Sequence, residues 1–201
     1  MALLSMKERR RVGELTIAAV VLWVAWLIQL AILSKLTFSQ VLCNLPLAMT
    51  IVWGATFGSR MKKPTSDELR MASVGEVLVR QLLSGSLSGA LVGGFFAALS
   101  YSILPVFPVA YPVIGWIAGY FSLKNFNQAA FLCIPLVLLL TFLAEIIMAG
   151  QMAIVGRPDV IGHFVTIGIP EALLNALIAP VIFIPMRGWF EFSQWRQGAY
   201  E

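Results

Sequence analysis

Two polar side chains lie within an apolar C-terminal stretch of the chain, residues 169–187. Glu171 and Asn175 are four residues apart, so they share one face if the stretch is helical. A carboxylate and an amide are costly at membrane depth unless partners satisfy them, and such residues often mark functional sites. Three interpretations stay open for this pair: a hydrogen bond that fixes helix packing, a contact for a partner's transmembrane helix, and a substrate pocket.

A second carboxylate, Glu145, lies in the apolar stretch 129–149. Together with Glu171 it would supply two carboxyl groups that can in principle carry protons, although nothing else in the sequence supports a pump. Glu145 lies near the end of its stretch, where it can instead reach outward to the surface or pair with Arg157. His163 is the only histidine, and its position in a loop favours a surface residue.

Enzymatic chemistry finds little support among the motifs. The chain has no Gly-rich phosphate loop, no HExxH and no Ser/His/Asp set with supporting context. An intramembrane protease would need paired aspartates, or a Ser and a His, within spans, whereas Asp67 and Asp159 fall in loops. Cys43 and Cys133 have no metal-ligand spacing and are expected near opposite membrane faces, so we expect no disulfide between them. We therefore predict a protein that is not an enzyme and has no cofactor or metal.

The composition predicts an integral membrane protein. Of 201 residues, 59% are hydrophobic and only 12% are charged, whereas a soluble domain is about 25% charged. The net charge of +4 is better explained by cytoplasmic loops rich in Lys and Arg than by nucleic-acid binding. We expect membrane lipids and other membrane proteins as partners, and no nucleic acid.

The apolar stretches predict an all-α polytopic protein, one membrane domain with six transmembrane helices. Each span needs about 20 residues. The predicted spans are 15–33, 41–57, 81–103, 106–121, 129–149 and 164–186, and the polar segment 59–76 is a predicted cytoplasmic loop. Of the 14 Lys and Arg residues, only Lys35 and Arg157 then fall on the side opposite the termini. This bias predicts that both termini are cytoplasmic.

Small residues recur at four-residue spacing in two neighbouring spans. The third span carries Gly85, Gly89 and Gly93, and the fourth carries Gly115 and Gly119. Small residues at this spacing let helix backbones approach closely. We therefore expect tight packing between these two spans, with homodimerisation through the same glycines as the alternative.

The predicted topology gathers polar residues at similar depth. Because a helix rises 1.5 Å per residue, Glu145, Glu171 and Asn44 fall in one layer of the outer half of the bundle. Asn175 lies one turn deeper, and Arg157 lies in the outer loop above. We expect a polar cluster of these five residues that faces a partner or a ligand.

The C-terminal stretch PEALLNALIAPVIFIPMRGWFE resembles the last helix of the rod shape-determining protein MreD family. The matching features are the Asn175-Ala176 step, the stretch from Pro180 to Phe183, and Arg187 at the exit. The middle of the chain, GALVGGFFAALSYSILPVFPVAYPVIGWIAGYF, looks like that family's Gly-rich helix, its turn and its next Gly-containing helix. Where members of the family often carry an Asp, this chain has Ala97 and Ala98.

The resemblance implies a non-enzymatic scaffold of the bacterial cell-elongation machinery in the cytoplasmic (inner) membrane. Such a scaffold would bind a single-span partner such as MreC and support peptidoglycan synthesis. It also implies a fold similar to the substrate-binding subunits of energy-coupling factor vitamin transporters.

That similarity supplies an alternative function, a substrate-binding transporter subunit with a small-molecule ligand in an outward-facing pocket. The first span disfavours it, because it lacks the expected row of alanines and carries Trp23 and Trp26. A third alternative is an accessory or assembly subunit of another membrane complex.

Overall fold

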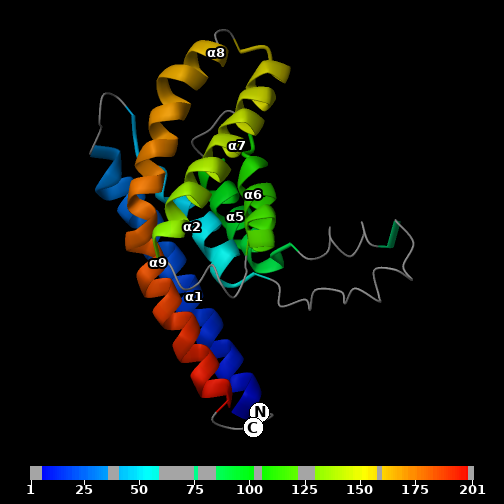
Figure 1. Cartoon of the computed structure of the whole chain (residues 1–201), viewed down its shortest axis with the longest axis vertical. Coiled ribbons are helices and arrows are strands. Elements are labelled where there is room, and N and C mark those ends of the chain that lie inside the picture. Colours follow the sequence, from blue (N-terminus) through cyan, green and yellow to red (C-terminus); the bar gives the residue numbers. More distant parts are fainter. Residues whose placement is uncertain are drawn as a thin grey trace.

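The computed structural model describes residues 6–35, 41–58, 75–76, 85–101, 106–121, 130–157 and 160–198. The elements formed by these residues are helices (Figure 1). Three of the helices are long and apolar enough to cross a membrane. The predicted helical class is therefore confirmed, and the long apolar helices indicate a membrane protein.

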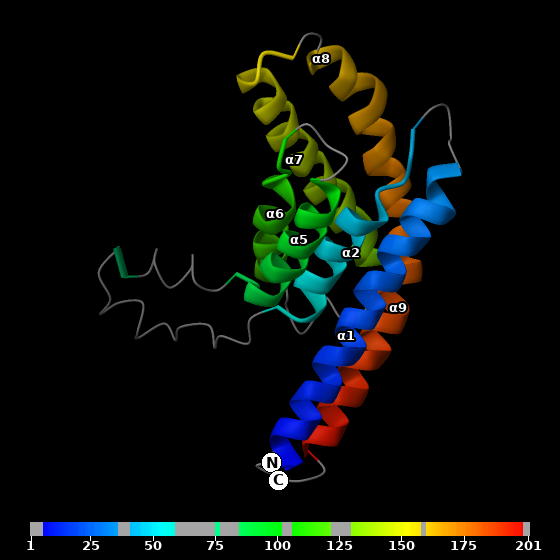
Figure 2. The same cartoon turned by 180° about the vertical axis from the view of Figure 1, so that it is seen from behind.

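The long helices are α1 (Met6–Ala31), α7 (Cys133–Ile154) and α9 (Ile169–Gly198). The 22 residues of α7 extend over about 33 Å, slightly more than the roughly 30 Å of a bilayer's hydrocarbon core. A short helix, α8 (Val160–His163), and a π-helical turn, Phe164–Gly168, lead into α9. Figure 2 shows that the start of α1 and the end of α9 lie at the same end of the molecule.

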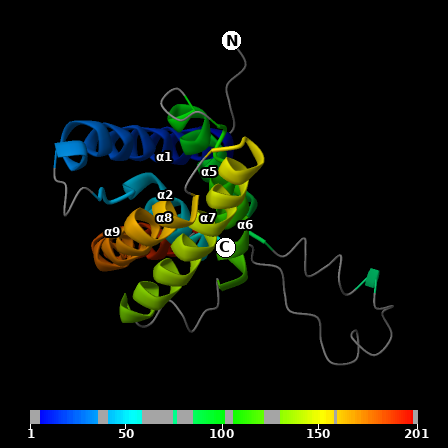
Figure 3. The same cartoon turned by 90° about the horizontal axis from the view of Figure 1, so that it is seen from above.

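Three shorter helices fill the middle of the bundle: α2 (Leu45–Thr56), α5 (Leu87–Ser100) and α6 (Ala110–Ala118). The 12 residues of α2 extend over only about 18 Å. Every residue of α2 is buried, and α2 contacts α1, α5, α6, α7 and α9. The view in Figure 3 shows α2 between α1 and α9. A helix that is apolar all round and short therefore forms the centre of the fold.

The helix ends differ from the predicted span ends, and local caps explain part of the difference. Ser86 caps α5, because its Oγ accepts a hydrogen bond from the Gly89 N–H at 3.0 Å, so α5 begins well inside the predicted span 81–103. α9 extends to Gly198, past the predicted end at 186, and contains Pro180 and Pro185. The predicted cytoplasmic loop 59–76 lies outside the described residues except for positions 75–76.

Glycines form the contact at which α2, α5 and α6 meet. A Cβ atom at Gly89 would overlap the carbonyl oxygen of Gly115 and would lie 2.8 Å from the Cα of Gly54. A Cβ at Gly115 would in turn overlap the carbonyl of Gly89. Gly93 lies against the backbone of Tyr111 in the same way. The backbones of the three helices therefore touch without intervening side chains.

The two outer glycines of the predicted rows lie at the other end of the α5–α6 contact. A Cβ at Gly119 would overlap the backbone of Ser86, and a Cβ at Gly85 would overlap the ring of Trp116. The Ser86 N–H also donates to the Trp116 carbonyl at 3.1 Å. All five glycines of the two rows thus face the neighbouring helix or its flanking residues.

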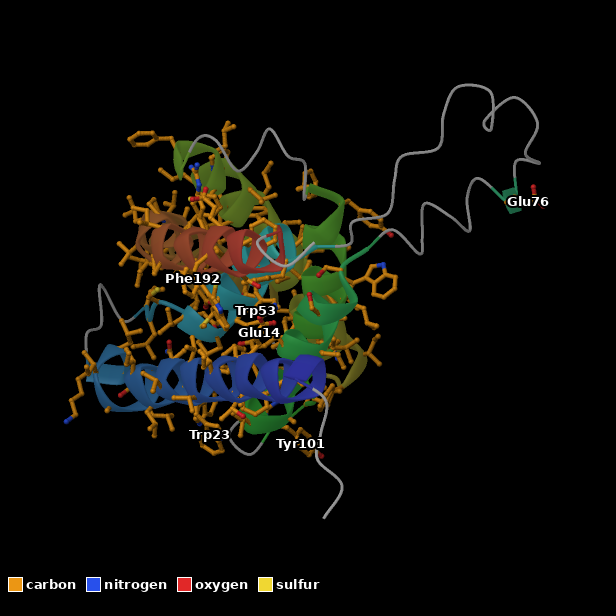
Figure 4. All side chains as sticks on the ribbon, turned by 90° about the horizontal axis from the view of Figure 1, so that it is seen from below. Glu14, Trp23, Trp53, Glu76, Tyr101 and Phe192 are labelled. Carbon is orange, nitrogen blue, oxygen red and sulfur yellow. The ribbon has the colours of Figure 1, made fainter. Side chains whose placement is uncertain are left out.

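An aromatic cluster packs the end of α2 against the C-terminal half of α9. The ring of Trp189 lies 5.6 Å from those of Trp53 and Phe57, edge to face in both cases. Trp53 is buried, whereas Trp23 of α1 is 49% exposed. Figure 4 shows the same contrast, with Trp53 between the helices and Trp23 on the outer side of α1. The cluster thus anchors α9 in the half of the bundle that holds the start of α1 and the end of α9.

Candidate functional site

Polar side chains from six helices or their flanking residues converge in one layer of the bundle, which we call the polar layer. The layer lies at the C-terminal ends of α1 and α5, in the C-terminal half of α7, and at the N-terminal ends of α2, α6 and α9. These parts of the helices lie in the half of the molecule away from the start of α1 and the end of α9 (Figures 1 and 2). Its members are Gln29, Cys43, Asn44, Ser100, Tyr111, Glu145, Glu171 and Asn175.

The start of α2 explains much of this polarity. The first N–H groups of a helix have no partner within the helix, and here they lie inside the bundle. Asn44 is the N-cap residue, and its Oδ1 accepts a hydrogen bond from the Leu47 N–H at 3.2 Å. Pro46 has no N–H to satisfy. The N–H groups of Asn44 and Leu45 remain, and both need acceptors from outside α2.

Two side-chain amides supply those acceptors. Asn175 Oδ1, from α9, accepts the Asn44 N–H at 2.8 Å, and Gln29 Oε1, from α1, accepts the Leu45 N–H at 2.9 Å. Asn175 Oδ1 also accepts from the Cys43 thiol at 3.3 Å. Each free donor at the start of α2 is therefore satisfied, and the amides tie α1 and α9 to the central helix.

The burial of Asn175 separates the three interpretations of that residue. Asn175 is 0% exposed, so its amide does not face the outside of the bundle. Its Oδ1 accepts hydrogen bonds from Cys43 and Asn44 of the same chain. For Asn175 the geometry favours the packing interpretation over a direct contact with a partner's helix.

Tyr111 extends the same network to α6. The Asn44 Nδ2 donates to the Tyr111 hydroxyl at 2.8 Å, and the hydroxyl also lies 3.2 Å from Asn44 Oδ1. The hydroxyl lies near the Ser100 side chain at the end of α5 as well. Asn44 therefore joins α2, α6 and α9 through one side chain and its backbone N–H.

The two carboxyl groups lie beside this network at the contact between α7 and α9. A Cβ atom built at Gly168 would lie 3.4 Å from the Cβ and Cγ of Glu145. Gly168 is three residues before Glu171, so the two positions share one face of the helical segment. The Glu171 carboxyl lies near the side chains of Asn44 and Asn175 and interacts electrostatically with Glu145.

Four of the five predicted cluster residues come together, and the fifth does not. Asn44, Glu145, Glu171 and Asn175 all belong to the polar layer. Arg157 is exposed beyond the end of α7. Ile154, the last residue of α7, lies nine residues or about 13 Å past Glu145. Arg157 therefore does not take part in the layer.

Four members of the layer were not predicted: Gln29, Cys43, Ser100 and Tyr111. Gln29 carried a usable signal, because it is the one strongly polar residue in the predicted span 15–33. Cys43 and Tyr111 carried no such signal, because a thiol and a phenol are common in apolar cores. Ser100 carried none either, because it is one of several serines in the predicted span 81–103. Both cysteines are free, and Cys133 lies away from the polar layer.

A small cavity lies in the opposite half of the bundle. It has a volume of about 10 Å³, which is roughly the room that one water molecule needs. Its lining is almost wholly apolar and includes no member of the polar layer. The lining residues are Val52, Ala55, Phe121, Cys133, Leu136, Val137 and Phe183.

Comparison of the chain with protein-family models, with curated proteins and with solved structures gives no match.

Proposed function

We propose that this chain is a non-enzymatic scaffold of the bacterial cell-elongation machinery, similar to the MreD family. In this proposal it crosses the inner membrane six times with both termini in the cytoplasm, and it binds a single-span partner such as MreC. The resemblance of the C-terminal stretch around Asn175-Ala176 and Pro180 supports the family. The distribution of Lys and Arg supports the orientation.

The observation that carries the proposal is the use of the amide oxygens in the polar layer. A transport subunit needs polar groups that remain free to bind its substrate. Here the oxygens of Gln29 and Asn175 accept backbone N–H groups of α2. These two amide oxygens therefore hold helices together, which suits a rigid protein that presents surfaces to partners.

The long helices carry exposed apolar faces that are available to a partner's helix. On α9, four apolar residues on one side are 53–71% exposed: Leu173, Leu177, Val181 and Ile184. On α7, Leu139 is 67% exposed, and on α1, Val24 is 47% exposed. Each of these positions contacts either lipid or another transmembrane helix.

Site-specific photo-crosslinking in native membranes tests the proposal. A photoreactive residue would be placed at Leu177, Leu139 or Val24, one position for each long helix. We expect at least one position to crosslink a single-span membrane protein that also co-purifies with the full chain. A matched control is the same residue at Glu191, which is 59% exposed and lies beyond the predicted span.

Crosslinks to lipid alone from all three positions, with no co-purifying membrane protein, would contradict the scaffold. A small molecule that co-purifies and binds saturably would instead support the transporter alternative. Mass spectrometry of the same preparation distinguishes the two results.

A further inference from the structure

The capping of α2 accounts for the amides of the polar layer but not for its two carboxyl groups. Glu145 packs against Gly168, which lies three residues before Glu171, at the contact between α7 and α9, and the two carboxyl groups interact electrostatically. Neither carboxyl accepts a helix N–H of α2. Two ionised carboxylates at this depth would repel each other and would both lose hydration. The pair therefore needs something that neutralises part of its charge.

The described residues supply no cation for this purpose. Neither Glu145 nor Glu171 forms an ion pair with a described Lys or Arg side chain. Along α9 the first basic residue after Glu171 is Arg187, sixteen residues or about 24 Å away. The titratable groups of other described elements that face Glu171 are Cys43, Tyr111 and Glu145. None of these three groups carries positive charge.

Two unsatisfied atoms show which kind of neutralising group fits. Glu171 Oε1 is buried and makes no hydrogen bond. Asn175 Nδ2 is also buried without a partner, in a residue that is 0% exposed. A metal cation or an ammonium group at this place would be repelled by the N–H donors of the Asn175 amide. A proton on the carboxyl pair avoids this repulsion, because a protonated carboxyl group can still accept a hydrogen bond from Nδ2 while it donates its own O–H.

We propose that Glu145 and Glu171 form a proton-binding site, in which one proton is shared between the two carboxyl groups and holds α7 against the start of α9. A hydrogen bond from a carboxylic acid to a carboxylate is short and charge-assisted. The proton belongs to the pair, because two interacting carboxyls titrate together. This site goes beyond the scaffold function and does not depend on the identity of any partner.

The proposal sets the sign of the pH dependence of stability. Carboxyl groups of the unfolded chain in water release their protons at about pH 4. At neutral pH, therefore, only the folded protein holds the proton. Stability then falls as the pH rises through the range in which the pair releases it, because the folded state binds more protons than the unfolded state.

Thermal unfolding of the full chain in detergent, between about pH 5 and pH 9, tests the site. We expect the Tm of the unmodified protein to fall by several degrees across this range. Glu171→Gln, which resembles the neutral acid, should keep the Tm of the acidic condition and lose most of the pH dependence. Glu191→Gln is the matched control, because Glu191 is exposed and paired with Arg187, and it should keep the original slope.

Two results would overturn the proposal. One is a Glu171→Gln variant that retains the pH slope of the unmodified protein. The other is a Glu171→Gln variant that fails to fold, because a neutral side chain of the same shape should be tolerated. Infrared spectroscopy of the unmodified protein gives an independent readout: the carbonyl band of a protonated carboxylic acid should be present at neutral pH, and its absence would refute the shared proton.

Discussion

Gly89→Leu is expected to prevent the chain from accumulating as a folded bundle in the membrane. A Cβ atom at position 89 already overlaps the carbonyl oxygen of Gly115 and approaches the Cα of Gly54. Overpacking of a core costs about 1–3 kcal/mol when side chains can move aside. Here the obstructing atoms are backbone atoms of two other helices, so we expect a cost of about 3 kcal/mol or more, which is a large fraction of a typical stability of about 5–15 kcal/mol.

Gly94→Leu is the matched control for this prediction. Gly94 lies on the same helix, five residues from Gly89, and a Cβ there would have nothing within 4 Å. The substitution should be tolerated and should add helix propensity of up to about 1 kcal/mol. Size-exclusion chromatography and thermal unfolding in detergent would measure both variants. Equal yield and equal Tm for the two would show that the glycine contact does not hold the fold together.

Asn175→Leu is expected to lower the free energy of unfolding by about 2–3 kcal/mol, because a buried donor without its acceptor costs about 1–3 kcal/mol. The substitution removes the oxygen that accepts the Asn44 N–H and the Cys43 thiol. Leu has a similar size, so the loss should come from the orphaned donors more than from a cavity. The measurement is chemical or thermal unfolding of the full chain in detergent.

Leu177→Ala is the control that separates the loss of the Asn175 oxygen from a general effect of substituting residues on α9. Leu177 is two residues away and 71% exposed, so its truncation should change stability by less than about 0.5 kcal/mol. If Asn175 instead served a partner, Asn175→Leu would leave the isolated protein as stable as before and reduce only partner recovery. That pair of results would contradict the packing role.

Composition predicted the helical class because an apolar chain must satisfy its backbone within helices at membrane depth. Glycine spacing pointed to α5 and α6, since close backbone approach depends on residue size alone. The lengths of the short helices could not be predicted in the same way. Hydropathy depends only on how apolar the side chains are, whereas the starts of α2 and α5 depend on the caps supplied by Asn44 and Ser86.

The depth of each residue along its helix predicted that four polar residues lie close together, because a fixed rise per residue converts sequence position into height. These residues are Asn44, Glu145, Glu171 and Asn175. The direction of each side chain could not be predicted from height. That Asn175 turns toward α2 follows from the start of α2 inside the bundle, where its N–H groups need acceptors. The role of Gln29 depends on the same tertiary fact.

Side-chain amides cap the buried start of α2, and removal of one backbone N–H at that position is the sharpest test of this cap. Replacing Leu45 by its α-hydroxy acid keeps the side chain but removes the N–H that Gln29 Oε1 accepts. This ester would be combined with Gln29→Leu in a double-mutant cycle. The ester carbonyl is a weaker hydrogen-bond acceptor than the amide carbonyl, and the cycle cancels this cost because it is the same with and without Gln29.

Each single change should destabilise the folded chain by about 1–3 kcal/mol. If Gln29 caps α2, the double variant should cost at least about 1 kcal/mol less than the sum of the two single changes. Costs that add to within about 0.5 kcal/mol would mean that Gln29 and the Leu45 N–H do not interact, and would contradict the cap.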